Sequence, residues 1–326
     1  MLRVGVVGVG SMGQNHARIY SEMGNLVCVY DAFADAADKV ASRLRTTACG
    51  SVAELLSKVD AVSICTPTST HYDVAVQAIK AGKAVLLEKP FTGVVETATT
   101  VCEAAEDEGV TLASGFVERF NPVVSATKDS LSAGRFGELV SISSRRVSSF
   151  PSRIRDVGVI KDLAIHDVDV IRYITSSEVR SVYALGGRMN NPQFEDHASF
   201  LMEVGDRVVG TVEANWLTPM KVRKVSLTCS KGFVEMDYVD QSLEFSTASF
   251  QDVDLANLSN IPMELDSRHI FVKKEEPLKR ELQSFVRAAS SNAKAEVDGW
   301  DAVANLKVCD AALQSLKEGK RVEIQA

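Results

Sequence analysis

The sequence lacks the features that mark membrane, secreted and nucleic-acid-binding proteins. Among its 326 residues, no apolar run approaches the eighteen or so that cross a membrane, and the N-terminus does not have the form of a signal peptide. The Lys and Arg residues are scattered, and the formal net charge is −7, which argues against nucleic acid as a partner. The composition, 45% hydrophobic and 24% charged, is that of a globular protein, which we expect to be cytoplasmic.

Cysteine is scarce and widely spaced. The six cysteines form no CxxC pair, and Cys28 and Cys65 lie inside apolar strand-like runs, where a thiol behaves as a small hydrophobic group. This distribution favours a reducing compartment and gives no pattern of a structural zinc site. We therefore expect no metal.

The first thirty-one residues carry the strongest positive signal. The apolar run 2–7 leads into a GxGxxG turn, a helix-like segment follows, and the apolar run 26–30 ends on Asp31. This order is the fingerprint of a dinucleotide-binding βαβ unit, in which glycines allow a tight turn and the helix N-terminus favours a pyrophosphate. The turn residues expected to bind the cofactor are Gly8, Gly10, Ser11, Met12 and Gly13.

Asp31 bears on the choice of cofactor. It lies eighteen residues beyond Gly13, where a carboxylate accepts hydrogen bonds from the ribose diol of adenosine. A 2′-phosphate would meet this negative charge, so NAD is favoured. NADP is the less favoured alternative, since Arg43 and Arg45 follow in the chain and could fold back toward a 2′-phosphate.

The length predicts two domains. Residues 1–120 alternate strand-like runs with helix-like segments, which predicts an α/β Rossmann domain with a doubly wound parallel sheet. The expected strands are 2–7, 26–30, 60–65, 84–88 and 110–115, and the expected helices are roughly 12–23, 34–44, 51–57, 70–81 and 93–108.

Residues 121–326 differ in character and predict an α+β domain for substrate binding and oligomerisation. β-rich segments joined by short turns indicate a large, mostly antiparallel sheet, and we read 248–268 as a loop excursion. The expected strands are 138–147, 179–187, 196–204, 207–216, 222–229 and 232–238, and the expected helices are about 121–133, 160–174 and 298–318.

Two groups of residues suggest proton-transfer chemistry. Lys89 follows a strand at the edge where ligands bind, so its pKa could be depressed for proton transfer, and Pro90 could fix the turn through a cis bond. Asp162 and His166 stand four apart, so on a helix the carboxylate can orient the imidazole for proton transfer. A surface lysine and an ordinary helix-surface hydrogen bond are the alternatives that these residues leave open.

Segments 8–17, 65–90 and 158–170 together resemble the Gfo/Idh/MocA family of NAD(P)-dependent sugar and inositol dehydrogenases, in the family's order and over nearly the full chain. The resemblance implies that Lys89 is the family's EKP lysine and that Asp162 and His166 are its catalytic Asp-x-x-x-His pair. It also implies a set of residues along the cofactor, with Glu88 near the nicotinamide: Thr66, Pro67, Thr68, His71, Glu88 and Lys89. Glycines that the family often has before the Asp and the His are partly replaced, since Val157 and Ile165 stand here, which indicates a particular branch.

Segments 115–122, 155–160 and 214–219 resemble the branch that acts on nucleotide sugars, at C3 of UDP-N-acetylglucosamine. Guanidinium groups suit a diphosphate, and Asn121 and Asn215 suit sugar hydroxyls, although an arginine considered by itself more often has a surface or ion-pair role. The residues expected to bind substrate are Lys89, Arg119, Asn121, Arg153, Arg155, Asp162 and His166.

We therefore expect NAD-dependent oxidation of a secondary sugar hydroxyl. His166 would be the base, Asp162 would orient it and Lys89 would stabilise the alkoxide, with Lys89 as the base in the alternative assignment. The other readings are an inositol, free-sugar or amino-cyclitol dehydrogenase, and a non-catalytic NAD-binding regulator. The open face of an antiparallel sheet and the resemblance both lead us to expect a homodimer or homotetramer.

Overall fold

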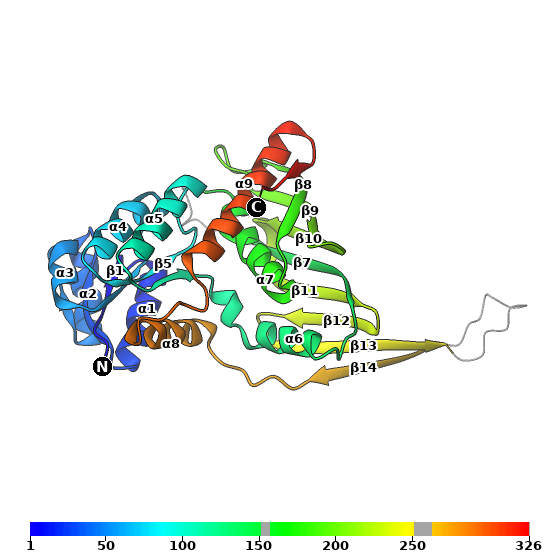
Figure 1. Ribbon diagram of the computed structural model, residues 1–326, viewed down its shortest axis with the longest axis horizontal. Coiled ribbons are helices and arrows are strands. Elements are labelled where there is room, and N and C mark those ends of the chain that lie inside the picture. Colours follow the sequence, from blue (N-terminus) through cyan, green and yellow to red (C-terminus); the bar gives the residue numbers. More distant parts are fainter. Residues whose placement is uncertain (151–156, 251–262, 326) are drawn as a thin grey trace, which may run out of the picture. The chain divides into compact units, whose positions relative to one another are not determined.

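The structure, a computed structural model, describes residues 1–150, 157–250 and 263–325 (Figure 1). The chain forms two compact units: Met1–Phe120 with Glu276–Lys307, and Asn121–Glu275 with Val308–Ala326. The first of these units begins with one continuous segment, residues 1–120. Residues 276–307, however, pack with the first unit and not with the second as expected. The reason is an amphipathic helix whose Leu278, Leu282 and Phe285 join the hydrophobic core of the first unit.

The first unit contains a six-stranded parallel sheet of order β3-β2-β1-β4-β5-β6, which confirms the Rossmann architecture. Its strands are β1 (Val4–Val7), β2 (Leu26–Tyr30), β3 (Thr47–Ala48), β4 (Ala61–Ile64), β5 (Ala84–Glu88) and β6 (Leu112–Gly115). Its helices are α1 (Ser11–Glu22), α2 (Ala34–Leu44), α3 (Val52–Lys58), α4 (His71–Lys80), α5 (Val95–Asp107) and α8 (Pro277–Ser290), with 3₁₀ turns η1 (Thr68–Thr70) and η2 (Val117–Phe120).

The register of this sheet brings the predicted ligand-binding segments to one edge. Val7 pairs with Tyr30 and with Ile64, and Ile64 pairs with Leu87. The strands are therefore level where they end, and the segments that follow β1, β2, β4 and β5 leave from the same edge. The central strands are buried on both faces, which explains their continuous apolar sequences.

The second unit contains a nine-stranded sheet of order β14-β13-β12-β11-β7-β10-β9-β8-β15, in which only β7 and β10 pair in parallel among the described strands. Its strands are β7 (Leu139–Ser149), β8 (Val179–Gly187), β9 (His197–Val204), β10 (Val208–Asn215), β11 (Leu217–Cys229), β12 (Gly232–Asp237), β13 (Ser242–Phe250), β14 (Met263–Ile270) and β15 (Val322–Glu323). Its helices are α6 (Pro122–Ser132), the π-helix η3 (Ile160–Ala164) and α7 (Ile165–Thr175), and α9 (Gly299–Glu318) contains the boundary at Lys307.

Two strands correct the expected loop excursion at 248–268. β13 extends to Phe250 and β14 begins at Met263, and the hydroxyls of Ser246 and Ser267 lie 2.6 Å apart across the pair. Few described side chains of these strands are buried, so no apolar alternation marks them in the sequence.

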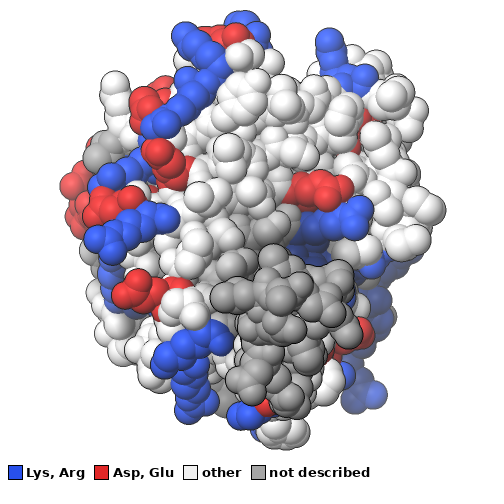
Figure 2. Space-filling view, turned by 90° about the vertical axis from the view of Figure 1, so that its right-hand side faces the viewer, with Lys and Arg blue, Asp and Glu red and all other residues white. Residues whose placement is uncertain are grey.

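One face of the large sheet carries helices, and the other carries exposed apolar side chains. α6 and α7 contact β7, β10, β12 and β13. On the opposite face of the sheet, the exposed apolar residues include Leu185, Leu201, Val209 and Phe233. In the view of Figure 2, acidic and basic side chains are interspersed around a broad uncharged area. No helix of the described residues is long and apolar enough to cross a membrane.

Candidate active site

The glycine turn has the shape that a pyrophosphate requires. Gly8 has a φ of +84°, and a Cβ on Gly13 would lie 1.8 Å from the carbonyl oxygen of Gly8, so the helix packs directly on the turn. A Cβ on Gly10, by contrast, would meet no atom within 4 Å, which leaves this side of the turn open. α1 has no acidic residue in its first turn and no side-chain cap at Gly10. Its first N–H groups, including those of Ser11 and Met12, therefore fit a dinucleotide phosphate.

Asp31 connects the glycine turn to the end of β2. Its Oδ2 accepts the N–H of Val9 at 2.8 Å, and its Oδ1 accepts the N–H of Phe33 at 3.0 Å. The carboxylate is thus fixed beside the turn. Its hydrogen bonds to the adenosine ribose stay a prediction.

The Glu88-Lys89-Pro90 turn ends β5, and its Lys89–Pro90 bond is cis, as the sequence suggests. Glu88 is buried, with Oε1 2.9 Å from Nε2 of His16, while its Oε2 accepts the N–H of Lys89 at 3.1 Å. A Cβ on Gly115 would lie 2.8 Å from Cδ of Glu88, so β6 confines the carboxylate from the other side. Glu88 therefore has one fixed position at the base of the turn that carries Lys89.

His71 links this turn to the segment after β4. Its Nε2 lies 2.8 Å from the carbonyl oxygen of Thr66, and its Nδ1 lies 3.0 Å from that of Pro90 and 3.2 Å from that of Phe91. Burial lowers the pKa of His71. The structure thus gives His71 a buried bridging position, while Pro67 and Thr68 are accessible at the start of η1.

Asp162 and His166 belong to the second unit, and both are buried. The sequence suggests one regular helix here, but the structure differs, because Asp162 lies in the π-helix η3 and His166 in the first turn of α7. A π-helical turn is rare and is often found at functional sites. Asp162 and His166 therefore lie where a π-helical turn leads into an α-helix.

Two contacts that sequence reasoning missed fix this helix. Asp167 forms a buried ion pair with Arg146 of β7, with Nε–Oδ2 at 2.8 Å and Nη2–Oδ1 at 3.2 Å. The Arg146 guanidinium also lies 4.9 Å from the centre of the Tyr238 ring. The pair fastens α7 to the sheet, and thereby fixes the segment that carries His166.

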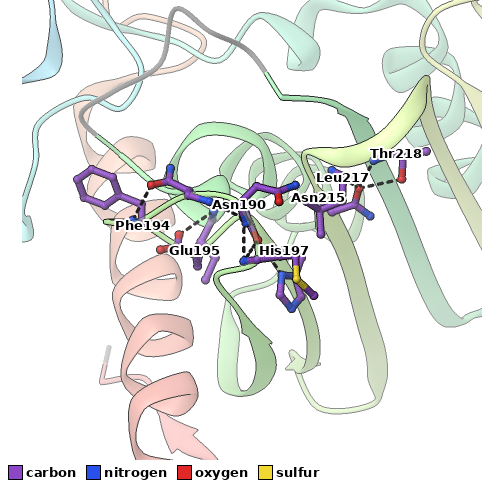
Figure 3. Close-up of polar contacts among 11 residues, drawn as sticks. Asn190, Phe194, Glu195, His197, Asn215, Leu217 and Thr218 are labelled. Carbon is purple, nitrogen blue, oxygen red and sulfur yellow. Dashed lines mark hydrogen bonds and ion pairs between the residues drawn. The ribbon is translucent and has the colours of Figure 1, made fainter.

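Glu195 accepts hydrogen bonds from the backbone at the start of η3 (Figure 3). Its Oε1 accepts the N–H of Ile160 at 3.1 Å, and its carbonyl oxygen accepts the N–H of Val159 at 3.0 Å. A Cβ on Gly158 would lie 2.0 Å from Oε1, so a larger residue there would displace the Glu195 carboxylate. Burial raises the pKa of Glu195. No local pattern signals these contacts, since Glu195 lies 35 residues beyond Ile160.

The loop before β9 is organised around a second buried carboxylate. The Oδ2 of Asp196 accepts backbone N–H groups of Met189, Asn190 and Asn191, and its Oδ1 lies 2.9 Å from Nδ1 of His197. Burial by itself would raise the pKa of Asp196, but these hydrogen bonds outweigh it and hold the pKa at about 2. The loop that presents Glu195 to η3 is therefore itself fixed.

The predicted substrate residues have mixed placements. Nη1 of Arg119 donates to Asp301 at 2.8 Å, and Asn121 caps α6 and donates to the carbonyl oxygen of Tyr238 at 3.1 Å. Asn215 accepts hydrogen bonds from Leu217 and Thr218 (Figure 3). Arg119 and Asn121 thus have structural contacts, and the diphosphate and sugar contacts expected of them stay predictions. Arg153 and Arg155 lie outside the described residues.

Comparison with known proteins identifies the family. Residues 2–116 match the model of an oxidoreductase family with an NAD-binding Rossmann fold, and residues 124–235 match the GFO/IDH/MocA C-terminal domain. The chain is 32% identical to UDP-N-acetylglucosamine 3-dehydrogenase of Acidithiobacillus ferrooxidans, over 96% of each chain. It is 29% identical to inositol 2-dehydrogenase of Rhizobium meliloti, over 99% of each.

The solved structures agree in fold. A structure of the Acidithiobacillus ferrooxidans enzyme superposes with a TM-score of 0.86 at 29% identity, covering 97% of this chain and 98% of that one. Levoglucosan dehydrogenase in complex with NADH and L-sorbose superposes with a TM-score of 0.85 at 19% identity, covering 99% of each chain, which shows the fold alone. The chain therefore belongs to the Gfo/Idh/MocA family of oxidoreductases, and its first unit is an NAD-binding Rossmann domain.

Proposed function

We propose that this chain is a sugar dehydrogenase that uses NAD to oxidise a secondary hydroxyl of a nucleotide sugar, C3 of UDP-N-acetylglucosamine. The dehydrogenase chemistry is supported by the fixed Glu88–Lys89 turn at the sheet edge that also carries the glycine turn. The substrate is supported by the relative of that activity, which matches 96% of the chain.

The chain's own residues divide the chemistry as follows. His166 removes the hydroxyl proton, Asp162 orients its imidazole, and the Lys89 ammonium stabilises the negative charge that develops on the oxygen. NAD⁺, when bound, supplies the acceptor for the hydride that leaves the same carbon, so a ketone forms. In the alternative assignment, Lys89 removes the proton and His166 positions the hydroxyl.

A cyclitol is the second candidate substrate. The inositol 2-dehydrogenase of Rhizobium meliloti and the scyllo-inositol 2-dehydrogenase of Bacillus subtilis are 29% and 30% identical to this chain, each over 99% of it. Their substrates also carry secondary hydroxyls, so the same three side chains would serve.

A substrate panel separates the candidates. NADH formation is followed at 340 nm with UDP-N-acetylglucosamine, N-acetylglucosamine, myo-inositol and scyllo-inositol, each with NAD⁺ and with NADP⁺. We expect the highest kcat/KM for UDP-N-acetylglucosamine with NAD⁺. A higher value for an inositol would replace the nucleotide sugar by the cyclitol. Cofactor binding without NADH formation from any of these would instead favour the non-catalytic regulator.

We also propose that the protein forms a homodimer or homotetramer. Exposed apolar residues, including Leu201 and Phe233, lie on the face of the large sheet that α6 and α7 do not cover. Contact with another subunit would bury these side chains. Sedimentation velocity across a concentration series should give a dimer or a tetramer. A monomer throughout would contradict this proposal.

A further inference from the structure

Glu195 holds the start of η3 through contacts with three consecutive residues. Its Oε1 accepts the N–H of Ile160 at 3.1 Å, its carbonyl oxygen accepts the N–H of Val159 at 3.0 Å, and its carboxylate packs on Gly158. The first N–H groups of a helix have no partner within the helix, and Val159 supplies no side-chain cap of its own. Glu195 therefore acts as the helix cap, although it lies 35 residues beyond Ile160.

The capped residues are hydrogen-bonded directly to the segment that carries Asp162 and His166. The N–H of Asp162 donates to the carbonyl oxygen of Gly158 at 3.0 Å. The carbonyl oxygen of Ile160 accepts the N–H of Ile165, the residue before His166, with the i to i−5 spacing of a π-helix. A shift of Gly158 or Ile160 would therefore move Asp162 relative to His166.

The two ends of this segment are anchored by different elements. Asp167, directly after His166, is fixed to β7 by its buried ion pair with Arg146. The Asp162 end is fixed by Glu195, which comes from the loop before β9 (Figure 3). Loss of the Glu195 anchor can therefore disturb Asp162 and leave the rest of α7 in place.

The neighbouring groups cannot replace the Glu195 carboxylate. Ile160 is 0% exposed, so its N–H cannot turn to water if Oε1 is removed. The buried Asp196 already accepts the N–H groups that organise its own loop. Lys161 pairs with Asp310 of α9 at 2.6 Å, but this contact satisfies no backbone N–H of the turn. A buried donor without an acceptor is costly, so the turn should shift when its cap is lost.

We propose that Glu195 is a positioning residue of the reaction, whose cap on η3 holds the Asp162 carboxylate where it orients the His166 imidazole. The inference rests on the proposed function, in which Asp162 orients His166 for proton transfer. Its requirement is an acceptor oxygen within reach of the Ile160 N–H. Glutamine keeps such an oxygen on a side chain of the same length, whereas aspartate keeps the charge on a side chain that is one methylene shorter.

The test compares Glu195→Gln with Glu195→Asp in kinetics with NAD⁺ and the best substrate of the panel. Glu195→Asp should lower kcat about 10- to 100-fold, as expected when a catalytic group is misplaced by about 1 Å, and should leave the Kd for NAD⁺ unchanged. Glu195→Gln should keep most of the kcat. The losses of Glu195→Asp and Asp162→Asn should not add in the double variant, because both act through the same carboxylate.

The matched control is Glu178→Ala. Glu178 pairs with Arg172 at 2.7 Å near the C-terminal end of α7, so this variant removes a carboxylate from the other end of the same helix and should leave kcat unchanged. Should Glu195→Asp not fold, judged by circular dichroism, Gly158→Ala displaces the Glu195 carboxylate instead and should give the same loss of kcat. Full kcat in the variant used, or losses that add in the double variant, would overturn the proposal.

Amide hydrogen exchange, measured by mass spectrometry without substrate, separates failure of this proposal from failure of the proposed function. The peptide that contains Ile160 and Asp162 should exchange faster in Glu195→Asp than in the unchanged protein, and Glu195→Gln should restore slow exchange. Equal exchange in all three proteins would overturn the positioning role alone. Absence of NADH formation by the unchanged protein with every substrate of the panel would overturn the proposed function, and the positioning role with it.

Discussion

The buried ion pair of Arg146 and Asp167 gives the sharpest stability prediction. Its side chains are 1% and 0% exposed, so Asp167→Ala leaves the guanidinium buried without its carboxylate. Breaking a buried pair in this way costs about 3–5 kcal/mol of unfolding free energy. The preceding residue of β7 supplies a matched control: Arg145 pairs with Glu213 at 3.0 Å, but the side chains are 56% and 43% exposed. Glu213→Ala should therefore cost only about 0–1 kcal/mol.

Tryptophan fluorescence during urea unfolding can measure both losses. The chain has two tryptophans, the buried Trp216 of the second unit and Trp300 of the first. In a Trp300→Phe background, the signal reports on the unit that contains both ion pairs. Similar losses of under about 1 kcal/mol for Asp167→Ala and Glu213→Ala would refute the claim that this pair fastens α7.

Three further predictions concern the first unit. Gly13→Ala places a Cβ 1.8 Å from the oxygen of Gly8 and should abolish NAD⁺ binding, whereas Gly10→Ala should leave the melting temperature unchanged and weaken only NAD⁺ binding; calorimetry and thermal melts compare the two. Asp31→Asn keeps an acceptor oxygen but loses the charge, so the ratio of kcat/KM for NADP⁺ to that for NAD⁺ should rise roughly tenfold, and an unchanged ratio would contradict the ribose assignment. Burial lowers the pKa of His71, so the unfolded chain binds more protons there and stability falls as the pH drops below about 6.5; His71→Gln should lose less stability between about pH 7.5 and 5.5.

The Rossmann unit could be predicted because the residues that form each of its strands and turns lie close together in the sequence. β5 occupies 84–88 as expected, since a parallel strand buried on both faces must be continuously apolar. The strands β13 and β14 were missed because Ser246 and Ser267 pair on an exposed surface, where burial imposes no pattern. The packing of residues 276–307 was likewise missed, because the pattern of an amphipathic helix does not indicate which hydrophobic core the helix packs against.

The residues of the candidate site also differ in how well the sequence predicts them. The glycine turn, Asp31 and the cis turn at Lys89 depend on neighbouring residues, and the sequence alone indicates them. Asp167 and Glu195, in contrast, act through partners 21 and 35 residues away, and an ion pair between distant segments leaves no periodicity. The guanidinium of Arg119 is paired with Asp301, a contact that residue type alone does not indicate, and its diphosphate contact stays a prediction.

The most direct test of the proposed function is kcat/KM for UDP-N-acetylglucosamine and NAD⁺ in the unchanged protein, Lys89→Ala and His166→Ala, with the Kd for NAD⁺ measured alongside. Each variant should lose about 10²–10⁴-fold in kcat/KM, the usual worth of a positioned proton-transfer group, while NAD⁺ binding changes little. Turnover near that of the unchanged protein in both variants would contradict the assignment of catalysis to Lys89 and His166.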